Sequence, residues 1–214
     1  MFKSKSAILF DLDGTIINSQ AGIFASVRYA ADKLNLPQKS DTQLRAFIGP
    51  PLVSSFEKYY NLSDCDAQNA VKIYREFYSS KGVMMFDVYA GLEDTLKALK
   101  NAGKRMFVAT CKPENFAKII IENLGFSKYF NGVYGIFSDD MHTTKKQVIT
   151  RVMQENSLSA DECVMVGDTS FDIIGAHECN LSCIAVEYGF ADENGLTGAE
   201  KIVKSPSDIK SLFI

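Results

Sequence analysis

Short apolar runs alternate with segments of helical periodicity through the second half of the chain, and this alternation restricts the fold more than any other feature. Each run is followed by apolar residues spaced three or four apart. The runs lie at residues 106–109, 133–137, 163–166 and 182–186. Strands that are joined through helices enter a sheet in parallel, with right-handed crossovers. We therefore expect an α/β fold with a doubly wound, mainly parallel sheet, to which the apolar run 7–10 adds a first strand.

The segment between the first strand and this alternating part has a different pattern. Its apolar residues repeat only at helical spacing, and breaks at Pro37 and Pro50 divide it into several helices. No strand pattern appears there. We expect residues 1–15 and 87–214 to form the α/β core domain, and residues 16–86 to form an all-helical domain inserted after the first strand.

Charge and composition exclude several classes of protein. The 214 residues carry a net charge of −3, and no basic run longer than Lys145-Lys146 is present to neutralise nucleic-acid phosphates. No apolar run approaches the ~20 residues of a membrane-spanning helix, and too few apolar residues follow the basic N-terminus for a signal peptide. The 5 cysteines include no CxxC pair, which indicates free thiols in a reducing compartment. We expect a soluble, cytoplasmic monomer or homodimer that binds neither nucleic acid polymers nor membranes.

Polar residues follow the ends of the expected strands. The first strand is followed by Asp11, Asp13 and Gly14, the second by Thr110 and Cys111, and the fourth by Asp168, with Asp172 four residues later. Lys145 comes after the third strand, beyond Asp139 and Asp140, which we assign to a surface loop. Ligands of an open parallel sheet bind beyond the carboxyl ends of its strands, so these groups are expected at one edge. Taken singly, each acidic or hydroxyl residue also fits an ordinary turn or helix cap.

The order and spacing of these residues resemble the four motifs of the haloacid dehalogenase superfamily of phosphotransferases. The first motif, DxDGT, is Asp11-Leu12-Asp13-Gly14-Thr15, and the fourth, GDxxxD, is the segment 167–172. Thr110 resembles the second motif and Lys145 the third. The resemblance covers nearly the whole chain, and the helical insertion resembles a type-1 cap domain. Residues 89–91 and 166–176 are most similar to phosphoglycolate phosphatases and 5′-nucleotidase-like phosphatases.

The resemblance implies a Mg²⁺-dependent phosphatase that acts on a small phosphorylated metabolite, either 2-phosphoglycolate or a nucleoside 5′-monophosphate. Asp11 would attack phosphorus and form an aspartyl-phosphate. Asp13 would protonate the leaving oxygen and later deprotonate the hydrolytic water. Asp11, the backbone carbonyl of Asp13 and Asp168 would hold Mg²⁺, which prefers oxygen ligands. Asp172 would orient metal-bound water or Lys145.

The resemblance also assigns the groups that bind the substrate phosphate. Gly14 would let the backbone turn tightly and bring N–H groups close to the phosphoryl oxygens. Thr110 and the N–H of Cys111 would bind a phosphoryl oxygen, and Lys145 would supply positive charge. Lys146 is the alternative to Lys145, and the spacing to the following apolar helix face favours Lys145.

The turn around Gly49 is the expected specificity element of the helical insertion. It resembles the cap loop that points at the active site in this superfamily, and Arg45 lies one helical turn earlier. Both residues are therefore candidates for contacts with the leaving group. A plain interhelical turn is the alternative interpretation.

Two other activities fit part of the pattern. A phosphomutase of the β-phosphoglucomutase type shares the fold and the cap. A receiver-like signalling domain shares the sheet, an acceptor aspartate, a threonine and a lysine, but it is shorter and has no helical insertion. A haloacid dehalogenase is disfavoured, because those enzymes lack the second aspartate that this chain has as Asp13.

Overall fold

The structure is a computed structural model that describes residues 2–137, 143–191 and 195–214. Asp139 and Asp140, which the sequence assigns to a surface loop, lie outside these residues. In the part of the chain that the structure describes, no helix has both the length and the apolar character needed to cross a bilayer.

The chain divides into two compact units. One comprises Met1–Asn18 together with Val88–Ile214, and the other comprises Ser19–Asp87. The second unit is thus inserted into the first, close to the start of the chain. The domain boundaries expected from the sequence, with an insertion at 16–86, stay a prediction.

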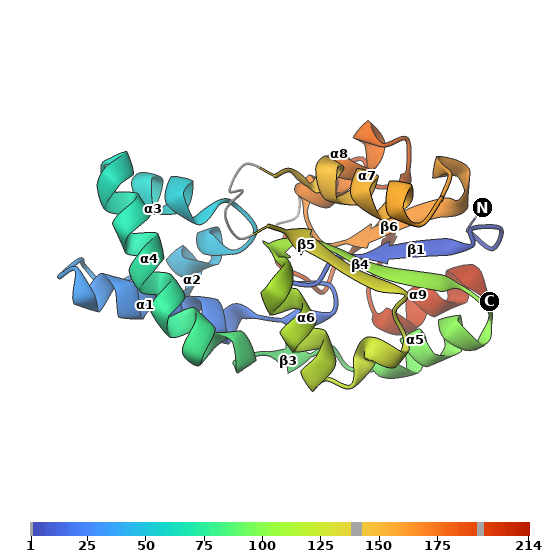
Figure 1. Ribbon diagram of the computed structural model, residues 1–214, viewed down its shortest axis with the longest axis horizontal. Coiled ribbons are helices and arrows are strands. Elements are labelled where there is room, and N and C mark those ends of the chain that lie inside the picture. Colours follow the sequence, from blue (N-terminus) through green and yellow to red (C-terminus); the bar gives the residue numbers. More distant parts are fainter. Residues whose placement is uncertain (1, 138–142, 192–194) are drawn as a thin grey trace. The chain divides into compact units, whose positions relative to one another are not determined.

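The first unit contains a six-stranded sheet among the described residues. The strand order is β5-β4-β1-β6-β7-β8, and every neighbouring pair is parallel. The predicted parallel α/β sheet is therefore confirmed (Figure 1). The sequence pattern did not indicate β8, which is short and contains a lysine. The bounds are β1 Ala7–Phe10, β4 Arg105–Pro113, β5 Gly132–Ile136, β6 Cys163–Gly167, β7 Ser182–Val186 and β8 Lys201–Val203.

Strand β1 lies in the interior of the sheet and aligns the ends of its two neighbours. Phe10 is paired with Val108 of β4 and with Val166 of β6. The N–H of Asp11 continues the pairing by donating to the carbonyl of Val166 over 2.9 Å. All four residues of β1 are 0% exposed, which fits a parallel strand that is covered on both faces and therefore apolar throughout. The segments that follow β1, β4 and β6 consequently emerge at one edge.

Helices cover both faces of this sheet. Figure 1 shows α7 and α8 on one face and α5 and α9 on the other. The core under α7 and α8 includes Leu9, Phe107 and Ile149, each 0% exposed. The bounds are α5 Leu92–Asn101, α6 Glu114–Asn123, α7 Lys145–Glu155, α8 Ser170–Glu178 and α9 Pro206–Phe213, with short 3₁₀ turns at η3 Phe126–Lys128 and η4 Ala160–Glu162.

The second unit is helical, as the periodicity predicts. Its longest helices, α1 and α4, pack together. A Cβ on Gly22 of α1 would lie 2.1 Å from the carbonyl oxygen of Gly82, so this approach requires glycine. The bounds are α1 Gln20–Lys33, α2 Asp41–Leu44, η1 Arg45–Phe47, α3 Leu52–Tyr60, α4 Asp64–Ser80 and η2 Gly82–Met84; the short strands β2 Ile17–Asn18 and β3 Asp87–Val88 lie where the chain passes between the units.

Candidate active site

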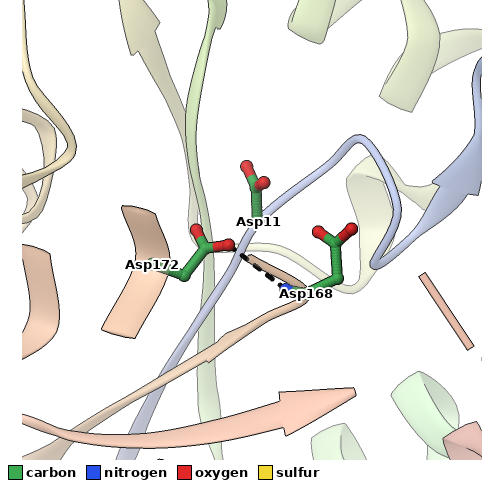
Figure 2. Close-up of side chains that lie close together, drawn as sticks. All are labelled: Asp11, Asp168 and Asp172. Carbon is green, nitrogen blue, oxygen red and sulfur yellow. Dashed lines mark hydrogen bonds between the residues drawn. The ribbon is translucent and has the colours of Figure 1, made fainter. Parts of the chain in front are cut away.

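Three carboxylates gather at the carboxyl edge of the sheet. Asp11 directly follows β1, Asp168 directly follows β6, and Asp172 lies in the first turn of α8. One carboxylate oxygen from each lies within 4.8 Å of the others. Asp11 is 8% exposed, and Asp168 and Asp172 are 0% exposed. Figure 2 shows the three side chains converging from these separate elements. The structure therefore brings together acids that are about 160 residues apart, as expected for the ends of adjacent parallel strands.

Lys145 supplies a cation to this cluster. Its Nζ lies 2.8 Å from Oδ1 of Asp11 and 2.8 Å from Oδ1 of Asp172, and it donates to the carbonyl of Ala109 over 3.1 Å. Lys145 is the first residue of α7 and is 6% exposed. A Cβ on Gly175 of α8 would lie 2.7 Å from Cγ of Lys145, so this glycine makes room for the lysine stem. Of the two adjacent lysines, the structure brings Lys145 to the carboxylates.

Burial and mutual repulsion change the proton affinities of these groups. Burial raises the pKa of Asp11 to about 6, with a further rise from Asp172 that the ammonium of Lys145 opposes. Burial and the charges of Asp172 and Asp11 hold the pKa of Asp168 well above its usual value. Burial disfavours the charged form of Lys145, but the charges of Asp11 and Asp172 outweigh it and hold the lysine pKa well above its usual value. The raised pKa values of Asp11 and Asp168 therefore mean that one ammonium group does not fully balance the negative charge that the cluster has when its carboxyl groups are ionised.

The Asp168 carboxylate is fixed by groups from two other segments. The hydroxyl of Thr15 donates to Oδ1 over 3.3 Å, and the backbone N–H of Phe190 donates to Oδ2 over 2.8 Å. A Cβ on Gly14 would lie 2.0 Å from Oδ2 of Asp168, and one on Gly189 would lie 2.3 Å from its Cβ. Sequence reasoning missed the contribution of Gly189 and Phe190. The only available signal was a glycine soon after the last expected strand.

Asp172 combines a structural and a site role. Its Oδ2 accepts hydrogen bonds from the N–H of Asp168 over 3.2 Å and from the N–H and hydroxyl of Thr169 over 3.0 and 2.9 Å. The hydrogen bond from the Thr169 N–H is part of the capping box at the start of α8. The other oxygen faces Lys145. Asp172 therefore ties the helix start, the backbone of Asp168 and the lysine together.

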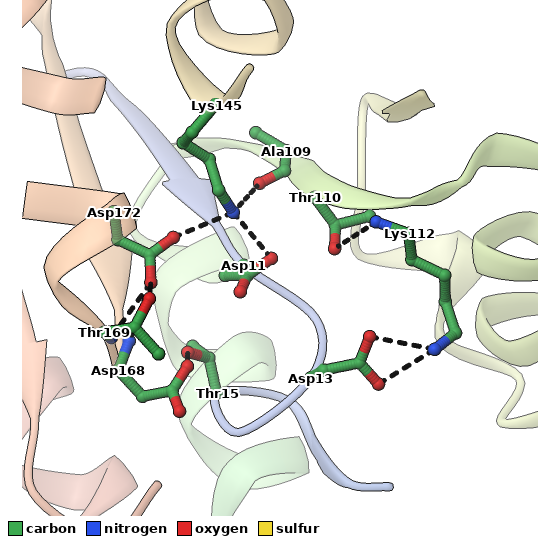
Figure 3. Close-up of polar contacts among 10 residues, drawn as sticks. All are labelled: Asp11, Asp13, Thr15, Ala109, Thr110, Lys112, Lys145, Asp168, Thr169 and Asp172. Atoms are coloured by element: carbon green, nitrogen blue, oxygen red, sulfur yellow. Dashed lines mark hydrogen bonds and ion pairs between the residues drawn. The ribbon is translucent and has the colours of Figure 1, made fainter. Parts of the chain in front are cut away.

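The second aspartate of the first motif lies on a different side of the site. Asp13 is partly exposed and forms an ion pair with Lys112 of β4, whose Nζ lies 2.8 Å from Oδ2 (Figure 3). Thr110, on the same strand, is 2% exposed, and its hydroxyl accepts the N–H of Lys112 over 3.2 Å. Cys111 is partly buried, and burial raises the pKa of its thiol. Sequence reasoning missed Lys112, although the two-residue period of a strand places it on the face of Thr110.

The residues expected to set specificity belong to the second unit. Arg45 begins η1 and is exposed, and Gly49 has a φ of 101°, a left-handed conformation that favours glycine. Their relation to the carboxylate cluster stays a prediction.

Comparison with known proteins identifies the family. Residues 8–186 match the family model of the haloacid dehalogenase-like hydrolases. The chain belongs to this family. A Pseudomonas aeruginosa protein named 5′-nucleotidase is 36% identical over 189 residues, covering 88% of this chain and 86% of its own length. This haloacid dehalogenase-like hydrolase also resembles a Vibrio parahaemolyticus protein named phosphoglycolate phosphatase, 29% identical over 194 residues, with coverages of 86% and 84%.

A solved structure supports the same assignment. The crystal structure of a predicted phosphatase from Clostridium acetobutylicum superposes with a TM-score of 0.91 and 37% identity, covering 97% of each chain. The chain described here is therefore a haloacid dehalogenase-like hydrolase, as the motifs indicated.

Proposed function

We propose that this hydrolase is a phosphatase, which hydrolyses a small phosphomonoester through an aspartyl-phosphate on Asp11, with Mg²⁺ as cofactor. The observation that carries the proposal is the buried cluster of Asp11, Asp168 and Asp172 around Lys145 at the carboxyl edge of the sheet. A phosphate monoester is a dianion that repels nucleophiles, so its hydrolysis depends on charge neutralisation and in-line positioning. The cluster offers a nucleophile and a cation side by side.

The residues present fit a magnesium ion. Three buried carboxylates face one ammonium group, and burial together with their repulsion raises the pKa of Asp168 well above normal. An oxygen-rich site with excess negative charge is the kind that binds a hard divalent cation. Asp11, the backbone carbonyl of Asp13 and Asp168 would hold it. When bound, Mg²⁺ would neutralise charge on the substrate phosphate and help to orient it.

The chain's own residues would then divide the reaction into two steps. Asp11 attacks phosphorus while Asp13 donates a proton to the leaving oxygen, and Asp13 then accepts a proton from the water that hydrolyses the aspartyl-phosphate. Before the attack and after the hydrolysis, Lys145 keeps the free Asp11 carboxylate in place by its ion pair. The asymmetry of the site supports this division, because Asp11 is buried with Lys145 while Asp13 is partly exposed.

The phosphoryl oxygens would be held by groups that surround Asp11. Gly14 has a φ of 84°, a left-handed conformation that favours glycine and allows the tight turn after β1. The hydroxyl of Thr110, the N–H of Cys111 and the ammonium of Lys145 are the other proposed donors. Preorganised donors of this kind stabilise charge as it develops in the transition state.

The proposed substrate is 2-phosphoglycolate or a nucleoside 5′-monophosphate. Relatives that carry the names 5′-nucleotidase and phosphoglycolate phosphatase support this choice. The inserted helical unit would act as a cap, with Arg45 and Gly49 contacting the part of the substrate beyond the phosphate. Closure of a cap over the site would exclude water and select the leaving group.

Phosphate release from a panel of compounds tests the proposal. The panel holds 2-phosphoglycolate, nucleoside 5′-monophosphates, sugar phosphates and pyrophosphate, each with Mg²⁺ and with EDTA. We expect metal-dependent release concentrated on one class and no turnover by Asp11→Asn. Normal activity in clean Asp11→Asn protein would refute the nucleophile, and full activity in EDTA would refute the metal. Isomerisation of a sugar phosphate without phosphate release would instead identify a phosphomutase.

A further inference from the structure

A second buried lysine faces the aspartate that is proposed as acid and base. Lys112 is 9% exposed, and its Nζ lies 3.0 Å from Oδ1 and 2.8 Å from Oδ2 of Asp13. The two residues are 99 positions apart in the sequence. Burying a lysine is unfavourable unless a partner compensates its charge, so this placement is a specific feature of the fold.

The strand that carries Lys112 also carries a proposed phosphate-binding group. Side chains alternate along β4, so Thr110 and Lys112 share a face, and the N–H of Lys112 donates to the hydroxyl of Thr110. The pairing of β4 with β5 shifts register between Ala109 and Pro113, which is where this segment leaves the regular sheet. Figure 3 shows the outcome: Lys145 approaches Asp11 from one side of the site, and Lys112 approaches Asp13 from the other.

We propose that Lys112 is a positioning residue, whose ammonium group holds the Asp13 carboxylate in the direction that proton transfer requires. The inference rests on the acid and base role proposed above for Asp13. A carboxylate on two rotatable bonds has several orientations, and a cation that contacts both of its oxygens selects one of them. Proton transfer needs the carboxyl oxygen within about 2.6–3.2 Å of its partner, and a displacement of about 1 Å lowers a rate by about 10²-fold.

Lys112 neither gives nor takes a proton in either step of the reaction. In the first step the bond from phosphorus to the leaving oxygen breaks, the bond from Asp11 to phosphorus forms, and the proton of the Asp13 carboxyl group passes to the leaving oxygen. In the second step the bond from the water oxygen to phosphorus forms, one proton of this water passes to the Asp13 carboxylate, and the bond from Asp11 to phosphorus breaks, which releases the Asp11 carboxylate and inorganic phosphate. Lys112 contributes only the direction of the Asp13 side chain, and this distinguishes it from a residue that binds substrate.

Two aryl phosphates of similar shape provide the test. Phenol is a weaker acid than p-nitrophenol, so hydrolysis of phenyl phosphate depends more on protonation of the leaving oxygen than hydrolysis of p-nitrophenyl phosphate does. We expect Lys112→Met to lower kcat/KM for phenyl phosphate by about 10²-fold and for p-nitrophenyl phosphate by a much smaller factor. Lys112→Arg should restore part of the loss, because a guanidinium group also contacts both carboxylate oxygens.

A double variant asks whether Lys112 acts through Asp13. In an Asp13→Asn background, Lys112→Met should cause no further loss of kcat/KM. The control is Lys118→Met, which removes an exposed lysine that forms an ion pair with Glu114 on α6 and should leave both substrates unaffected. Circular dichroism checks that each variant folds. If Lys112→Met does not fold, Lys112→Gln replaces it in the comparison of the two substrates and in the Asp13→Asn background.

The outcomes distinguish an error in the proposed role of Asp13 from an error in the proposed role of Lys112. If Asp13→Asn keeps wild-type kinetics, the proposed role of Asp13 is wrong and this inference is wrong with it. If Asp13→Asn is impaired while Lys112→Met is not, only the inference is wrong. Equal losses on both substrates, a rise in KM without a fall in kcat, or a further loss in the Asp13→Asn background would also overturn it, because each indicates a structural or substrate-binding role for Lys112.

Discussion

Replacing the proposed nucleophile with a neutral isostere should stabilise the metal-free protein. Asp11 is 8% exposed, and burial raises its pKa from 3.8 to about 6 despite the ion pair with Lys145. The folded chain therefore binds a proton at Asp11 more tightly than the unfolded chain does. Keeping this carboxylate charged at neutral pH is a cost of folding, and Asp11→Asn removes that charge with little change in shape.

The size and the sign of the effect follow from the pKa shift. A rise from 3.8 to about 6, at about 1.4 kcal/mol per pKa unit, corresponds to about 3 kcal/mol. A raised carboxyl pKa contributes stability that is fully present below the unfolded value and is lost as the pH rises through the folded value. We therefore expect Asp11→Asn to be more stable than the wild type by about 3 kcal/mol at pH ~7, and by little at pH ~4.

Urea unfolding in EDTA measures this difference at both pH values. Asp161→Asn, a change at an exposed acid, serves as the control and should alter the free energy of unfolding only slightly. Added Mg²⁺ should stabilise the wild type more than Asp11→Asn, because the ion would bind a site that the variant has weakened. An Asp11→Asn protein that is less stable at pH ~7, or a difference that stays the same at both pH values, would refute the argument from burial of charge.

Three further predictions, which use four substitutions, test other parts of the structure. Lys145→Met should lower kcat by about 10²–10³-fold, whereas Lys146→Met should stay near wild type; similar losses in both would contradict the choice between these lysines. Gly189→Ala should weaken Mg²⁺ binding by about 10–100-fold in calorimetry, because the new Cβ would lie 2.3 Å from the Cβ of Asp168; unchanged affinity would show that the Asp168 side chain accommodates the added methyl group. Gly22→Ala should lower the free energy of unfolding by about 1–3 kcal/mol in urea titrations, because its Cβ would meet a backbone carbonyl at 2.1 Å.

The sequence predicted the sheet because each strand carries its own signal. A parallel strand that is buried on both faces is apolar throughout, and β1, β6 and residues 106–109 of β4 have this character. Strand β8 has no such signal, since it combines a lysine with two apolar residues and lies at the edge of the sheet. Its place is set by pairing with β7, which is a tertiary interaction.

The predictable part of the candidate site consists of residues that end strands or begin helices. Asp11 and Asp168 were accessible from the sequence because their place follows from strand order alone. Phe190 was not, because its contact depends on how the segment after β7 turns. The strand period places Lys112 beside Thr110, but its contact with Asp13 also depends on how the segment after β1 turns. The Phe190 contact uses a backbone N–H, which any residue except proline provides, so the sequence contains no sign of it.

The charges of the described site residues explain why these positioning contacts are needed. Two lysines face four aspartates in this site. Lys145 forms ion pairs with the buried Asp11 and Asp172, next to which Asp168 lies, and Lys112 forms an ion pair with the partly exposed Asp13. A phosphate monoester that enters such a site adds further negative charge. In a buried environment the repulsion between like charges would turn the carboxylates apart or protonate them. The capping box at α8, Gly14 and Gly189 beside Asp168, and the two lysines restrain these side chains. The carboxylates therefore stay at fixed positions, where a divalent cation would neutralise their charge and that of the substrate phosphate.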